Sequence, residues 1–377
     1  MASLIYSPAY RGYDFGEEHP FSPLRVDMVL DLIKSLGHAV PYIEPEPASR
    51  EDILSVHDGT YVSLVESVSS GGPVEPALPF GLGTPDTPAF PGIDLATRRL
   101  VGGTLAAARL IAEGREAKVL QLGGGLHHAK RAKAAGFCVY NDLAVAIRHL
   151  TRQGLYVAYL DIDVHHGDGV QDIFYEDDHV ITISLHESGQ YLFPGTGDIH
   201  ELGAGMGRGL KVNIPLEPFT EDSSYIRTFE RVVPEALRWF GPGVLVVQAG
   251  ADAHFEDPLA DLLLTTHAYE TLFKRIVDLA DECAQGRLLV TLGGGYSVRA
   301  TPRIWTLLYL VLNGLPIPEE LPEEWAVRWE EKMKEQLSCF MHDPPGSYDK
   351  IARREEIERQ NRHVADRLLD STARYWI

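Results

Sequence analysis

Five short runs of apolar residues, each ending in glycine or in a cluster of polar side chains, constrain what this chain can fold into. The runs lie in KVLQLGGGLHH, LYVAYLDIDVHHGDG, HVITISLHE, GVLVVQAGAD and RLLVTLGGGY. Each is about as long as a β-strand and apolar on both faces, as in a parallel strand that helices cover on both sides. Helix-like segments lie between the runs, at residues 142–153, 225–240 and 265–285. This alternation predicts an α/β fold: a single domain with a doubly wound, mostly parallel sheet flanked by helices.

The character of the sequence changes after residue 317. Residues 318–377 are highly charged and helix-like, with the segment DPPGS in their middle. We therefore divide the chain into a main domain at 1–317 and a helical C-terminal extension at 318–377. Ile357, Val364 and Leu368 form only a narrow apolar stripe, so the extension either packs on the main domain or meets a partner through this stripe. We expect it to pack on its own domain.

Charge and cysteine content exclude several classes of protein. A formal net charge of -20 opposes a broad nucleic-acid or membrane surface, because both partners are recruited by positive charge. Cys138, Cys283 and Cys339 are too few and too scattered for a disulfide framework or a cysteine zinc site. The first residues lack the pattern of a secretory signal, and the apolar stretch at 304–312 is too short to span a bilayer. We expect a soluble, cytoplasmic enzyme.

The segment DIDVHHGDG, at residues 161–169, places three carboxylates and two imidazoles directly after a buried strand. Burying so many ionisable groups is costly unless a cation neutralises them. Asp163 and His165 are two residues apart, so on an extended backbone they point the same way and can bind one ion. The alternative is a polar loop whose aspartates cap the next helix. An isolated D-x-D would favour that alternative, but five ionisable groups together favour a metal site.

Asp252, at the end of QAGAD, is the candidate for a third metal ligand. With Asp163 and His165 it makes a set of two carboxylates and one imidazole, which balances a divalent ion and leaves it able to polarise water and a carbonyl. Taken alone, Asp252 is equally well explained as a cap on the segment that follows.

His127 and His128 follow a run of three glycines, and we interpret them as a general base and a general acid close to the metal. A lone histidine is more often structural. Two adjacent ones need carboxylates that accept their distal N–H groups, and Asp161 and Asp168 are available for this.

Tyr296 ends the run LGGGY, at the same predicted edge of the sheet. Its hydroxyl can donate a hydrogen bond to a developing oxyanion. Without the neighbouring motifs, a tyrosine that packs its ring would be the better interpretation. Neither glycine run has the spacing of a dinucleotide or nucleoside triphosphate loop.

Six motifs, GGGLHHA, GFCVYND, DIDVHHGDGV, FPGTGD, GAD and GGGY, occur in the order found in the histone deacetylase superfamily. The chain resembles above all the bacterial acetoin-utilisation deacetylase branch, over roughly residues 5 to 315. The resemblance implies the arginase/deacetylase-like fold and a zinc-dependent protein lysine deacetylase, with ferrous iron as the other metal such a site accepts. It assigns the metal to Asp163, His165 and Asp252, and polarisation of the acetyl carbonyl to Tyr296.

By the same resemblance His127 is the base, paired with Asp161, and His128 is the acid, paired with Asp168. The family also carries a structural potassium ion, whose ligands match Asp161, Asp163, His165, Ser184 and Leu185.

The resemblance also implies a narrow channel for the acyl-lysine side chain, an inner cavity below the metal and a rim residue that holds the substrate backbone. The channel positions match Gly136, Phe137, Phe193 and, at the gatekeeper, Leu259. The inner cavity matches His19, Pro20 and Arg25, and the rim residue matches Asp86, in the Pro- and Gly-rich loop at residues 73–92.

The expected reaction is hydrolysis of N-ε-acetyl-lysine in a protein or peptide, with release of acetate. By resemblance the natural partner is a metabolic enzyme such as an acetylated acyl-CoA synthetase. An acetylpolyamine deacetylase is the first alternative, and the apolar Leu259 disfavours it because a second ammonium needs an acidic gatekeeper. A ligand-binding module without turnover and a two-metal ureohydrolase are the remaining ones.

Overall fold

The apolar runs of the sequence form adjacent strands of one parallel sheet in the computed structural model, which describes residues 2–376. Within that range the sheet has seven strands in the order β1-β2-β7-β6-β3-β4-β5, and all pair in parallel. The strands are β1 Ser3–Ile5, β2 Lys118–Gln121, β3 Val157–Asp161, β4 Val180–Glu187, β5 Lys211–Leu216, β6 Val244–Gln248 and β7 Leu288–Thr291. The predicted fold class is confirmed.

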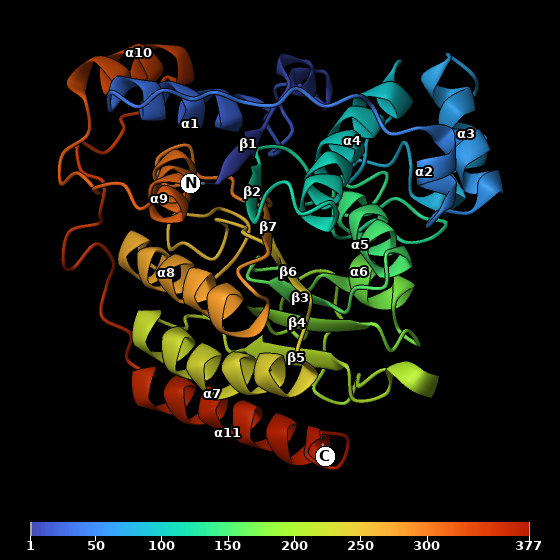
Figure 1. Cartoon of the computed structure of the whole chain (residues 1–377). Coiled ribbons are helices and arrows are strands. Elements are labelled where there is room, and N and C mark those ends of the chain that lie inside the picture. The colour runs from blue at the N-terminus through green and yellow to red at the C-terminus, as the bar shows by residue number, and fades with distance from the viewer. Residues whose placement is uncertain (1, 377) are drawn as a thin grey trace.

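Four adjacent strands inside the sheet, β7, β6, β3 and β4, are buried along their whole length. Helices cover both faces of the sheet, with α4, α5 and α6 on one side and α1, α9, α8 and α7 on the other (Figure 1). The helices are α1 Leu24–Ser35, α2 Arg50–Leu54, α3 Gly59–Ser69, α4 Ile93–Ala112, α5 Asp142–Arg152, α6 Asp168–Ile173, α7 Asp222–Phe240, α8 Thr266–Cys283, α9 Thr301–Asn313, α10 Glu323–Met333 and α11 Arg354–Thr372. None of these helices combines the length and hydropathy of a membrane-spanning segment.

The two edge strands were not predicted. β1 has only three residues and β5, with the sequence KVNIPL, interrupts its apolar residues with Lys211 and Asn213. The loop expected at residues 73–92 is irregular, apart from a 3₁₀ helix at Glu75–Phe80. The strands that lead into the candidate site are all among those that the apolar runs predicted.

The C-terminal extension lies along the domain at two places. Helix α10 packs on α1, and α11 packs on α7 and on the edge strand β5 (Figure 1). Ile357 and Leu368 of the expected apolar stripe are buried, and Val364 is partly buried. The stripe therefore faces the chain's own fold, and the division at residue 317 stays a prediction about domain organisation.

Lys211 is a fully buried lysine at the start of β5. Its Nζ donates to the Val180 carbonyl oxygen at 2.7 Å, and no carboxylate of residues 2–376 forms a salt bridge with it. Burial lowers the pKa of this ammonium to about 7, against a smaller opposing effect of Asp177. The folded protein therefore releases this proton near neutral pH, whereas the unfolded chain keeps it until about pH 10.

We predict that this lysine makes stability rise with pH. Between about pH 7 and pH 10 the unfolded chain binds one proton more at Lys211 than the folded protein does, so raising the pH favours the folded state. Relative to Lys211→Met, the wild-type free energy of unfolding should increase by on the order of a few kcal/mol across this interval. Urea unfolding of both proteins at several pH values measures the difference. Parallel curves would contradict the prediction.

Candidate active site

The candidate site residues lie at the carboxyl ends of five adjacent strands, β2, β7, β6, β3 and β4. Asp161 is the last residue of β3, and it pairs with Gln248 of β6 and Ser184 of β4. Parallel strands end at the same edge of the sheet, so loops that are distant in sequence meet there. This edge is where the structure brings the predicted ligands together.

Asp163, His165 and Asp252 each present one ligand atom within 4.8 Å of the others. His165 Nδ1 lies 3.3 Å from Asp163 Oδ1 and 3.1 Å from Asp252 Oδ2. The other oxygens are engaged by the backbone: Asp252 Oδ1 accepts from the Val164 amide and Asp163 Oδ2 from the Gly294 amide, at 2.9 and 2.8 Å. These bonds fix the carboxylates with one oxygen of each turned toward the imidazole.

The burial and charge of this set fit a divalent cation. Asp163, His165 and Asp252 are at most 8% exposed. Burial raises the pKa of Asp252 to about 8, with Asp163 adding to the effect, and the two carboxylates raise the pKa of His165 to about 10 against its burial. The shift of His165 and the contribution of Asp163 to that of Asp252 both reflect two carboxylates that share one imidazole. A tetrahedral zinc with three protein ligands and one open position would balance that charge.

Two glycines allow backbone to approach these ligands. A Cβ atom added at Gly294 would collide with Asp252 Oδ2, and one added at Gly250 would lie 2.5 Å from Asp163 Oδ2. A side chain at either position would displace a candidate ligand. The glycines of GAD and GGGY therefore serve close packing around the ligands.

His127 and His128 are oriented as the sequence predicted. His127 Nδ1 lies 2.9 Å from Asp161 Oδ2, and His128 Nδ1 lies 2.8 Å from Asp168 Oδ1. The two Nε2 atoms are 2.9 Å apart, and His127 Nε2 is 3.8 Å from Asp163 Oδ1. The two Nε2 atoms thus face one another on the side away from Asp161 and Asp168, and His127 Nε2 lies near the candidate metal ligand Asp163, as proton transfer at this point requires.

The surroundings shift the pKa values of the two imidazoles in opposite directions. Asp161 and Asp163 raise the pKa of His127 to about 9 against its burial, whereas burial and His127 lower the pKa of His128 to about 4. These charges alone favour a protonated His127 and a neutral His128, the reverse of the predicted base and acid. A cation bound at Asp163 would oppose the shift of His127. The division of roles between the two rings therefore stays a prediction.

Tyr296 is held over the site by its backbone and its ring. Its amide donates to Asp257 Oδ2 at 2.7 Å, and its ring meets that of Phe137 edge to face, 5.8 Å between centroids. Burial raises the pKa of its hydroxyl well above the ordinary value, and Asp252 and Asp163 add to this. The hydroxyl therefore keeps its proton and can donate a hydrogen bond.

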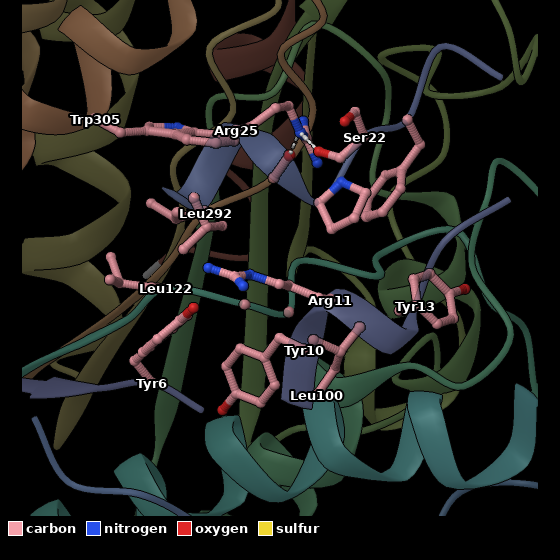
Figure 2. Close-up of a pocket in the computed structure, with 16 residues that line it drawn as sticks. Tyr6, Tyr10, Arg11, Tyr13, Ser22, Arg25, Leu100, Leu122, Leu292 and Trp305 are labelled. Carbon is pink, nitrogen blue, oxygen red and sulfur yellow. Dashed lines mark hydrogen bonds between the residues drawn. The ribbon is translucent and has the colours of Figure 1, made fainter. Parts of the chain in front are cut away.

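Arg25 lies behind Tyr296 in an inner cavity that adjoins the site. Its Nη1 donates to the carbonyl oxygens of Gly293 and Gly295, at 3.1 and 2.7 Å, so it supports the glycine turn that carries the tyrosine. Figure 2 shows Arg25 between Trp305 and Ser22 at one side of this cavity. The role of Arg25 in this cavity stays a prediction.

His19 and Pro20 are not among the residues that line this cavity, and their predicted place there stays a prediction. The His19 ring packs on Phe137, 4.5 Å between centroids, and its Nδ1 accepts from the Phe21 amide. This local bond turns the loop, so that Phe21 and Arg25, and not His19, reach the cavity.

Gly136, Phe137 and Phe193 of the predicted channel residues lie against the candidate site, and the gatekeeper role of Leu259 stays a prediction. The Phe193 ring meets the His128 ring edge to face at 5.0 Å, and Gly136 and Phe137 line the pocket together with His128 and Tyr296. Leu259 is partly exposed, and its amide is held by Asp257. Asp86 accepts from the Gly136 amide at 2.8 Å, so this rim aspartate is bonded to the channel wall.

The predicted potassium ligands lie behind the catalytic set. Asp161 of β3 lies opposite Ser184 of β4 in the sheet, and Leu185, the next residue of β4, is buried. The Ser184 hydroxyl is 2.9 Å from His186 Nδ1, and Asp161 Oδ1 accepts from the Asp163 amide. Potassium binding at these residues stays a prediction.

Several residues that shape the site escaped the sequence interpretation. Asp142 accepts from the Gly125 and Leu126 amides and so anchors the loop of the paired histidines. Gln248 donates to Asp163 Oδ2 and to the Gly125 carbonyl oxygen, and Tyr159 donates to Asp161 Oδ2 at 2.6 Å. Asp142 lies in the motif GFCVYND, in which the resemblance gave a role only to Gly136 and Phe137. A polar residue at the end of an apolar strand was the available signal for Gln248.

Comparisons with known proteins agree with this arrangement. Residues 19–312 match the histone deacetylase domain. The chain is 41% identical to the acetoin utilization protein AcuC of Bacillus subtilis (strain 168), covering 97% of this chain and 96% of that one. It is 35% identical to AcuC of Staphylococcus aureus (strain MRSA252), over 96% and 95%. A crystal structure of an HDAC homologue complexed with SAHA superposes with a TM-score of 0.83 at 28% identity, covering 96% and 99% of the two chains.

Proposed function

The chain belongs to the histone deacetylase family, and we propose that it hydrolyses N-ε-acetyl-lysine in proteins with a zinc ion at Asp163, His165 and Asp252. One observation carries the proposal. Three buried metal-type ligands converge beside two histidines whose Nε2 atoms are 2.9 Å apart. Each histidine is bonded to its own carboxylate on the far side of the ring.

The residues of the chain divide the reaction between them. A zinc ion bound at the three ligands would polarise the acetyl carbonyl and lower the pKa of a water molecule. His127 and His128 move protons at their Nε2 atoms, from the attacking water and to the leaving amine. The Tyr296 hydroxyl donates to the oxygen of the acetyl group as negative charge develops there. Phe137 and Phe193 enclose the alkyl part of the lysine side chain and exclude water.

The choice of acetyl-lysine over acetylpolyamine rests on the channel entrance. Leu259 is apolar, and an apolar gatekeeper gives no ion pair to the second ammonium of a polyamine. An acetyl-lysine side chain has no second ammonium, so an apolar residue at position 259 does not weaken its binding. We propose an acetylated metabolic enzyme, such as an acyl-CoA synthetase in the cytoplasm, as the partner.

Substrate preference tests this assignment. We expect the kcat/KM of the zinc-loaded protein to be higher for an acetyl-lysine peptide than for acetylspermidine. Leu259→Glu should shift the ratio toward the polyamine, because the new carboxylate can pair with its second ammonium. Steady-state kinetics with both substrates on both proteins measures the ratio. A wild-type preference for acetylspermidine would sink the proposal.

Tyr296→Phe tests the role of the hydroxyl. We expect kcat to fall by ~10²–10³, the usual cost of one lost oxyanion donor, and the zinc content to stay at the wild-type value. Tyr156→Phe, which removes a hydroxyl from a half-exposed tyrosine just before β3, is the control and should not change kcat. Undiminished turnover by Tyr296→Phe would refute the assigned role.

A further inference from the structure

Asp343 belongs to the C-terminal extension, yet its side chain is buried beside the loop that follows Asp252. It lies outside residues 19–312, which match the family domain. It is 6% exposed. Its Oδ2 accepts from His254 Nε2 at 2.9 Å and from the amide and hydroxyl of Thr266 at 2.8 and 2.9 Å, and its Oδ1 faces Arg303 Nη2 at 2.8 Å.

This carboxylate is strongly held in its ionised form. Burial raises its pKa, but hydrogen bonding to His254 and the charge of Arg303 outweigh burial and keep the pKa far below the ordinary value. Arg303 is itself 2% exposed. Removing one member of a buried ion pair leaves the other charge uncompensated, so the loss of either Asp343 or Arg303 would be costly.

The hydrogen bonds of His254 show which of its ring nitrogens donates to Asp343. The Glu256 amide donates to His254 Nδ1 at 3.1 Å, so Nδ1 carries no proton. The proton of the neutral ring is therefore on Nε2, which donates it to Asp343. The Glu256 amide and Asp343 therefore fix the tautomer and the orientation of the His254 ring from opposite sides.

The same loop holds two parts of the candidate active site. His254 is two residues beyond Asp252, and the Asp257 amide donates to the His254 carbonyl oxygen at 2.8 Å. The Asp257 carboxylate accepts from the amides of Tyr296 and Leu259, at 2.7 and 3.0 Å. A continuous path of hydrogen bonds therefore leads from the extension to the backbone of Tyr296.

We propose that Asp343 is a positioning residue for the active site: through His254 it holds the loop that carries the metal ligand Asp252 and the clamp residue Asp257. The C-terminal extension then completes the site from outside the family domain. The proposal rests on the proposed function only in taking Asp252 as a metal ligand. If instead Asp343 only fastens the extension to the fold, the metal site is independent of it.

The test compares two variants of the full chain that weaken the same buried cluster. Asp343→Ala removes the acceptor of His254, whereas Thr266→Ala removes a hydroxyl from the cluster and leaves the His254–Asp343 bond in place. We expect Asp343→Ala to weaken zinc binding, measured by competition with a chelator, and to lower kcat on an acetyl-lysine peptide, each by ~10–100-fold, as for other residues that orient a metal site. Thr266→Ala should lower the melting temperature and leave zinc affinity and kcat within about twofold of wild type, because the path to the site is intact.

Asp343→Asn provides the rescue. Its amide oxygen can still accept from His254, so zinc affinity should return close to the wild-type value although the charge pair with Arg303 is lost. Folded Asp343→Ala with wild-type zinc affinity and kcat would overturn the proposal. If Asp343→Ala does not fold, the variant His254→Gln replaces it in the test. This variant keeps the contacts of Asp343 with Arg303 and Thr266, and a zinc affinity equal to that of the wild type would also overturn the proposal. Zinc affinity needs no substrate, so a wild type that binds zinc and does not cleave the peptide would reject the proposed function alone.

Discussion

Three carboxylates buried at one edge of the sheet, those of Asp161, Asp163 and Asp252, set the constraint on which the rest of the structure depends. An unpaired buried carboxylate costs on the order of several kcal/mol, so each needs its own compensation. Asp161 has the imidazole of His127 and the hydroxyl of Tyr159. Asp163 and Asp252 share the single imidazole of His165, which leaves a charge that a divalent cation fits. The glycine turns and the oriented histidine pair are arranged around that position.

Much of this was predictable because apolar periodicity and strand-end chemistry are local features of a sequence. The runs that became β2, β3, β4, β6 and β7 were recognisable, and parallel strands bring their carboxyl ends together whatever the connecting loops do. The edge strands were missed because β1 is three residues long and β5 contains a buried lysine. The contacts of His19 could not be predicted, because they depend on one bond inside a loop, between its Nδ1 and the Phe21 amide.

The residues that hold the ligands in place were the least predictable part. Gln248, Asp142 and Asp257 act by accepting from or donating to backbone groups of other loops, and the sequence does not record which loops meet. Asp343 is the extreme case, since it reaches His254 from 89 residues further along the chain. The composition of the sequence suggests a boundary at residue 317. The hydrogen bond between Asp343 and His254 nevertheless connects the segment after this boundary to the candidate active site.

The central claim is that Asp163, His165 and Asp252 hold one catalytic metal ion. Anomalous diffraction from crystals grown with zinc tests it most directly. We expect one strong peak, about 2.0–2.2 Å from the ligand atoms of these three residues. Two peaks about 3.5–4 Å apart would indicate a two-metal site, and a peak only at the surface group Asp177, Asp178 and His179 would show that the buried set does not bind the ion. Either result would contradict the account.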